Sequence, residues 1–87
     1  MEGIKILVLD RGFVLLARIM PHPTLAFHWR CEPARTIRVW GTTQGLTELV
    51  NGPTDKTVLD PPANESHPFR AVLRIIDVEE KSWKKYL

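Results

Sequence analysis

The sequence contains one cysteine, no apolar run long enough to cross a membrane, and almost no excess of one charge sign. The lone cysteine, Cys31, excludes an internal disulfide and fits a reducing compartment. No stretch approaches the roughly 18 apolar residues of a membrane-spanning helix. Twelve Lys and Arg against ten Asp and Glu leave a net charge of +2, which is too small to imply a nucleic-acid or membrane partner by itself.

A secretory signal is not expected either. Residues 1–5 lack the basic region of a signal peptide, and the apolar run that follows is broken at Asp10-Arg11-Gly12. We therefore expect a cytoplasmic protein that does not associate with a membrane.

Catalytic motifs are missing as well. Residues 41–45 place two glycines ahead of a predicted helix but lack the Lys-Ser/Thr of a phosphate-binding loop. A threonine cap explains this stretch better. Anion binding at the helix entry ranks below the two functional hypotheses given at the end of this section. Cys31 is typical of an inert apolar residue, and the neighbours Glu79 and Glu80 favour a helix start over acid–base chemistry. We predict no catalytic residue and no enzyme activity.

The side chains of this sequence that could bind a soft metal ion are His22, His28, Cys31 and His67. The spacing of His28 and Cys31 would allow two ligands on one zinc ion. No second pair follows at the spacing that zinc modules use. We predict no metal site and no cofactor.

The composition and the apolar pattern predict one domain over residues 1–87. Apolar residues make up 44% of the chain and charged residues 25%, as in an ordinary globular protein. Period-two alternation and turn residues predict a hairpin of strands 4–9 and 13–20 around Asp10-Arg11-Gly12. Further expected strands are 24–30 and 35–40 joined by a turn at 31–34, then 54–60 around Thr57-Val58-Leu59, and 69–78 with side chains that alternate between two faces. The alternative for residues 24–40 is a single strand at 35–40 preceded by an irregular loop.

Two short helices and one loop complete the expected fold. Residues 43–51 follow a threonine cap at Thr42 or Thr43 and stop at Gly52-Pro53. Residues 79–86 follow a cap at Asp77, and Trp83 is expected to dock this helix on the core. Residues 61–68 hold three prolines and are expected to form a loop. The fold class is therefore α+β and β-dominated: a mostly antiparallel five- or six-stranded sheet or partial barrel with one or two short helices.

Part of the sequence resembles a known group of proteins. The residues that carry the resemblance are Arg35–Leu49, Gly52-Pro53-Thr54, Thr57–Asp60, and Ile75–Val78 followed by Trp83. This pattern, over residues 35–83, resembles small proteins of unassigned activity encoded by phages, prophages and other mobile elements. The resemblance implies a bacterial cytoplasm and an accessory role, and it supplies no catalytic residue.

The leading functional hypothesis is a non-enzymatic protein-interaction module, with self-association into a homodimer as one form. It rests on more apolar strand residues than one side of a small sheet requires: Leu7, Leu9, Leu15, Ile19, Leu25, Phe27, Val72 and Ile76. The competing interpretation is that loops such as 61–68 cover that face.

The alternative hypothesis is a small nucleic-acid-binding sheet with an arginine-rich face. The candidate phosphate ligands are Arg35, Arg38, Arg70 and Arg74, and the candidate stacking residues are Trp29 and Trp40. Against it, the ten acids dilute the field, and tryptophans in a small domain usually belong to the core.

Overall fold

The computed structural model describes residues 3–87. Strands dominate it, with one short α-helix and four 3₁₀ turns. The elements in chain order are β1 (Gly3–Leu9), η1 (Asp10–Gly12), β2 (Val14–Pro21), β3 (His28–Val39), η2 (Leu46–Asn51), β4 (Val58–Leu59), β5 (Ala63–Pro68), η3 (Phe69–Ala71), β6 (Val72–Asp77), α1 (Glu80–Trp83) and η4 (Lys84–Tyr86).

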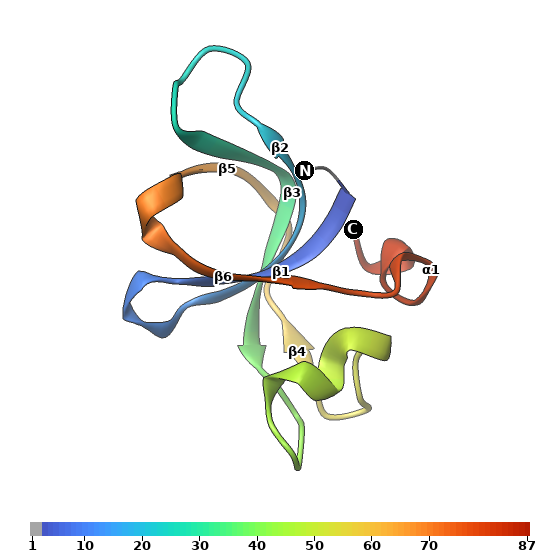
Figure 1. The fold of residues 1–87 in the computed structure, drawn as a ribbon. Helices are drawn as coiled ribbons and strands as arrows, with labels where there is room; N and C mark the ends of the chain where they lie inside the picture. Colours follow the sequence, from blue (N-terminus) through green and yellow to red (C-terminus); the bar gives the residue numbers. More distant parts are fainter. Residues whose placement is uncertain (1–2) are drawn as a thin grey trace.

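The strands form one six-stranded antiparallel sheet, which confirms the predicted fold class (Figure 1). The strand order is β4-β3-β2-β1-β6, and β5 pairs with β3 beside β4. β1 and β2 form the predicted hairpin, in which Ile6 faces Leu16 and Val8 faces Val14. The turn between them needs two residues with positive φ, Arg11 and Gly12. The sheet is not closed, because β5 and β6 do not pair within residues 3–87.

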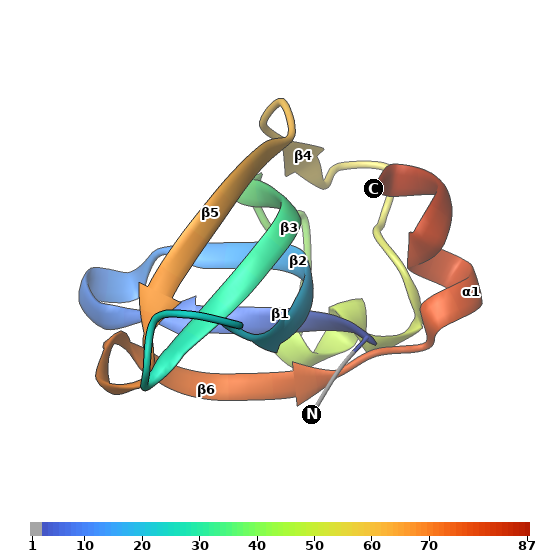
Figure 2. The same cartoon turned by 90° about the horizontal axis from the view of Figure 1, so that it is seen from above.

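The sheet bends so that β1 and β2 are covered on both faces. Figure 2 shows β3 and β5 side by side, crossing over one face of β1, β2 and β6. Between these layers lies the strand-side core of Leu7, Leu9, Leu15, Ala17, Ile19, Cys31 and Ala34. On the other face η2 and α1 enclose the helix-side core of Ile4, Ile6, Val14, Leu16, Ile37, Leu46, Leu49 and Trp83. Burial on both faces explains why β1 and β2 are nearly continuous apolar runs.

The predicted division of residues 24–40 into two strands was wrong. β3 is one strand of twelve residues, and the expected turn at 31–34 lies inside it. Pro33 fits there because the registers of β3 with β2 and with β5 both shift around it, so its missing N–H breaks no regular ladder. Residues 24–27 belong instead to the connection from β2 to β3.

The predicted helix 43–51 is shorter than expected. Only Leu46–Asn51 are helical, as a 3₁₀ turn that ends at Gly52 as predicted. No threonine side chain caps it; instead Glu48 Oε1 accepts hydrogen bonds from the backbone N–H groups of Thr43 and Gln44. The amides proposed for an anion are therefore satisfied by a carboxylate of the chain itself.

The predicted loop at 61–68 was also wrong, because residues 63–68 form strand β5 against β3. The predicted strand 69–78 loses its first three residues to η3. Within β6, Leu73 falls at a register shift opposite Val8 and Leu9, so the expected alternation of faces fails. Val72 and Ile75 both pack against the strand-side core in consequence.

The C-terminal segment forms the second predicted helix, from α1 into η4. Glu79, not Asp77, occupies its N-cap position; Asp77 ends β6 and pairs with Lys5 at 3.0 Å. Trp83 is fully buried, as predicted, and its indole N–H donates to the Leu49 carbonyl oxygen at 2.8 Å. This bond ties the C-terminal helix to η2.

Candidate interaction surface

The predicted basic face contains one arginine whose role is structural. Arg35 is half-buried on β3, and its guanidinium donates to two carbonyl oxygens, at 2.7 Å to Asp60 and at 3.0 Å to Tyr86. It thereby joins three segments that are far apart in the sequence. Because two of its donors are already used, Arg35 offers less to a phosphate than an exposed arginine does.

Arg38 and Trp40 lie together at the other end of β3. With Phe13 and Asp60 they line a shallow pocket of about 320 Å³. Trp40 is 40% exposed, so it is not a core residue. The Arg38 Nε donates to the Asp60 carboxylate at 2.6 Å, and this ion pair cancels most of the positive charge in the pocket.

Arg70 and Arg74 lie on other parts of the fold. Arg70 belongs to η3 and Arg74 to β6, and both are exposed. In the sheet, β6 is separated from β3 by β2 and β1. The structure therefore brings Arg38 to Trp40 and leaves Arg74 on the edge strand β6. Arg70 lies beside Phe69 in η3, and it is Phe69 that contacts Trp29.

Three aromatic side chains come together where the β2–β3 connection meets η3. We call Phe27, Trp29 and Phe69 the aromatic surface. The ring centroids of Trp29 and Phe69 are 4.8 Å apart, and those of Phe27 and Phe69 are 6.3 Å apart in an edge-to-face arrangement. Trp29 is half-buried against the strand-side core, whereas Phe27 is 77% exposed. In Figure 2 this corner lies at the lower left, where β3 begins and β5 turns into β6.

Phe27 has an unusual backbone conformation. Its φ is +59°, in the left-handed region that bulky residues rarely adopt. The conformation is fixed by a hydrogen bond of 2.7 Å from the Phe69 N–H to the Phe27 carbonyl oxygen. The chain thus holds a large apolar ring in water at a backbone position that disfavours it.

Two histidines order the loop that carries Phe27. The Nδ1 atom of His22 accepts hydrogen bonds from the N–H groups of Thr24 (3.1 Å) and Leu25 (3.0 Å). His28 Nδ1 lies 2.8 Å from the Ala26 carbonyl oxygen, to which it donates. These candidate metal ligands therefore have roles in loop structure, and no group of three metal-ligating side chains comes together anywhere in residues 3–87.

A pocket of about 480 Å³ opens beside the aromatic surface. Its lining is Ala26, Phe27, His28, Pro68, Phe69 and Arg70. Arg70 has no ion-pair partner among the described residues, whereas Arg38 contacts Asp60 and Arg30 contacts Glu32. The pocket therefore combines apolar walls with one uncompensated positive charge.

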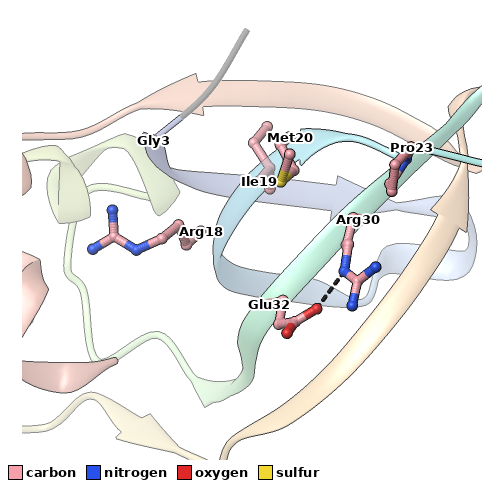
Figure 3. A pocket seen from close by; sticks show the side chains of 7 residues that line it. All are labelled: Gly3, Arg18, Ile19, Met20, Pro23, Arg30 and Glu32. Atoms are coloured by element: carbon pink, nitrogen blue, oxygen red, sulfur yellow. Dashed lines mark hydrogen bonds and ion pairs between the residues drawn. The ribbon is translucent and has the colours of Figure 1, made fainter.

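A second pocket, of about 490 Å³, lies near the start of β1 (Figure 3). Its two cations are both compensated: Arg30 pairs with Glu32, and Arg18 reaches Glu80 at 3.2 Å. Figure 3 shows the Arg18 guanidinium pointing away from the Arg30–Glu32 pair, so the cations do not converge on one ligand. This pocket offers no concentrated binding group.

Cys31 is fully buried in the strand-side core. Desolvation, with a smaller contribution from the nearby Glu65 carboxylate, raises the pKa of its thiol to about 11. A thiol that stays protonated and inaccessible is a poor nucleophile, as the sequence predicted for an inert residue.

Sequence reasoning found part of this surface. It named Trp29 and Arg70 as binding residues and counted Phe27 among the surplus apolar residues, but it placed Phe69 inside a strand. No local pattern marks the turn at Phe69–Ala71, because its three residues alternate apolar and polar as those of a strand would.

Comparison with known proteins gives no family assignment: no protein-family model, no curated protein and no solved structure matches this chain. Within residues 3–87 there is no helix with the length and apolar character that a membrane span requires.

Proposed function

We propose that this chain is a non-enzymatic interaction protein that binds a protein partner through the aromatic surface. The observation that carries the proposal is Phe27, which combines 77% exposure with a φ of +59°. Together the two features give the isolated fold no net benefit, because the small area that the ring buries is offset by the cost of a left-handed backbone for a residue with a side chain. Strained residues of this kind concentrate at binding and catalytic sites.

Four of the apolar strand residues that suggested an interaction surface are not exposed. Leu7, Leu9, Leu15 and Ile19 were counted as surplus, yet all four are buried beneath β3 and β5. Residues 61–68 do help to cover that face, but as a strand. What supports the proposal now is the aromatic surface itself, since exposed aromatic residues near a pocket are typical anchors of protein interfaces.

The resemblance to proteins of phages and mobile elements supports an accessory role in a bacterial cytoplasm, and we include that setting in the proposal. A second copy of the chain is one partner to be tested. Sedimentation velocity over a range of concentrations tells self-association from a monomeric state in which the chain binds a different protein. Phe27→Asn should abolish self-association if it occurs.

The test of the binding function is capture from a bacterial lysate with three immobilised proteins. These are the natural chain, Phe27→Asn and Leu73→Ala. The Leu73 variant is the control, because it removes another exposed apolar side chain, 63% exposed on β6 and outside the aromatic surface. The proposal expects a discrete protein that the natural chain and Leu73→Ala retain and Phe27→Asn loses. Retention that ignores Phe27→Asn, or an empty capture with a monomeric chain, contradicts it.

Nucleic-acid binding remains the alternative, and the pocket with Phe13, Arg38 and Trp40 is the observation that favours it. Two aromatic side chains there can stack bases, and Arg38 can contact a phosphate if it leaves its ion pair with Asp60. Retained nucleic acid that disappears after nuclease treatment and with rising salt supports this function. Equal retention by Arg38→Ala and by Trp40→Ala proteins argues against it.

A further inference from the structure

We infer that the partner of the aromatic surface is an acidic protein segment: an apolar or aromatic side chain flanked by carboxylates. This inference rests on the proposed function and specifies its partner. The apolar side chain would sit against Phe27 and Phe69, and a carboxylate would reach Arg70. All three residues line the same pocket of about 480 Å³.

The charge at this surface determines the sign of the partner. Arg70 is exposed and has no carboxylate partner within residues 3–87. The one acid on β5, Glu65, is engaged with His67 at 2.8 Å. A partner with a carboxylate beside its apolar anchor gains an ion pair with Arg70, whereas a partner with a lysine there meets repulsion.

The arrangement favours a peptide over a nucleic acid. Strong binding of a phosphate backbone draws on several cations, and Arg70 is the one arginine or lysine among the residues that line this pocket. The Phe27 and Phe69 rings stand at 84° to each other, so they form an angled recess and not a flat platform for stacked bases. One apolar side chain of a peptide fits such a recess.

Two backbone hydrogen bonds hold the residues that line this recess in place. The Phe69 N–H binds the Phe27 carbonyl oxygen, and the His22 N–H binds the His28 carbonyl oxygen at 2.9 Å. These bonds fix both walls of the pocket before a partner arrives. A preformed site loses less conformational entropy on binding, so a short peptide is an adequate probe.

The experiment uses three capped nine-residue peptides with a central phenylalanine in a glycine–serine background. The phenylalanine is flanked on both sides by aspartate, by asparagine or by lysine. Binding to the full chain is measured by shifts of backbone amide NMR signals, at low and at high salt. We expect the aspartate peptide to bind about two- to fivefold more tightly than the asparagine peptide, as one exposed ion pair allows, and the lysine peptide to bind most weakly.

Two arginine variants locate the charge effect. Arg70→Gln should remove the preference for aspartate and keep the binding of the asparagine peptide. Arg74→Gln, which changes an exposed arginine outside the pocket, should keep the preference. Phe27→Asn should weaken all three peptides together, since it removes the apolar wall that they share.

The outcomes separate the two proposals. Equal affinities, or a preference for lysine, overturn the acidic partner and leave the proposed function standing. Absence of binding by all three peptides at millimolar concentration also overturns this inference, while the lysate capture decides the function independently. Binding that survives Phe27→Asn overturns the aromatic surface itself. An oligothymidylate that binds more tightly than any peptide, and is lost with Phe27→Asn, assigns the surface to nucleic acid.

Discussion

The conformation of Phe27 leads to a prediction about two substitutions that remove the same ring. Phe27→Ala keeps a Cβ-bearing residue that resists positive φ. Phe27→Asn places there a residue that adopts the left-handed region with little cost. Comparing the two variants separates the strain of the backbone from the contacts of the ring.

The expected magnitudes follow from the exposure of the ring and from its φ. At 77% exposure the ring buries only about 50 Å² of roughly 200 Å², which is worth about 1 kcal/mol at ~25 cal/mol/Å². The left-handed backbone costs a residue with a Cβ about 1–2 kcal/mol. Phe27→Ala loses the contacts and retains the strain, so it should destabilise the fold by about 1 kcal/mol. Phe27→Asn loses the contacts and relieves the strain, so its net effect should be near zero.

Thermal and urea unfolding measure the difference directly. A gap of about 1 kcal/mol corresponds to a melting temperature about 4–8 °C higher for Phe27→Asn than for Phe27→Ala in a domain of this size. Leu25 lies in the same loop without positive φ and provides the control, since its Asn variant should gain nothing over its Ala variant. Equal stability of the two Phe27 variants would refute the strain argument. A loss of partner binding in both is expected, because both lack the ring.

Three further predictions concern the framework of the fold. Gly41→Ala should destabilise it by at least about 2 kcal/mol, because the φ of Gly41 is +70° and a Cβ there would lie 2.5 Å from a backbone carbon. Gly12→Ala is the comparison: its Cβ would meet open space, so urea unfolding should show a loss of only about 1 kcal/mol. Trp83→Phe should lower the urea midpoint by the equivalent of about 2 kcal/mol through the lost hydrogen bond to Leu49 and lost volume, and an unchanged midpoint contradicts the role of this bond. The pKa of Cys31 is raised to about 11, above the roughly 8.5 of an unfolded thiol, so the free energy of unfolding should be unaffected below about pH 8.5 and should fall between there and pH 11. Cys31→Ala should abolish that fall, and an identical decline in both proteins would exclude the thiol as its cause.

The local pattern predicted those elements whose residues carry a burial signal. The two strands of the β1–β2 hairpin are nearly continuous apolar runs separated by a turn with a glycine, so both strands and the turn were found. Trp83 was expected to dock the C-terminal helix, and it does. In these cases one segment of sequence contains the whole reason for its structure.

The missed elements depend on partners that are distant in the sequence. β5 is polar, ends at Pro68 and has a largely exposed face, so nothing within it indicates a strand; only its pairing with β3 makes it one. Pro33 read as a turn because a proline removes a ladder hydrogen bond, yet shifted registers on both sides accommodate it. The displacement at Leu73 likewise depends on its neighbour β1, and it changes which side chains of β6 reach the core.

The same distinction applies to the candidate site. Aromatic and arginine residues could be named from the sequence, but their grouping could not, because Phe27 and Phe69 are brought together by a hydrogen bond across 42 positions (69 minus 27). The positive φ of Phe27 could not be predicted from the sequence. Positive φ is expected at glycine or asparagine, and a phenylalanine gives no such indication.

The position of the aromatic surface explains why a small domain stays stable although this surface is exposed. The two cores use the apolar residues of β1 and β2 on both faces, so the stability of the fold depends little on the corner where β3 begins and β5 turns into β6. Of the three aromatic residues there, only Trp29 packs against a core. Phe27 and Phe69 therefore contribute mainly to binding and little to folding. Substitutions at Phe27 should change partner affinity far more than they change the free energy of unfolding. A surface whose residues were retained for packing would show the reverse.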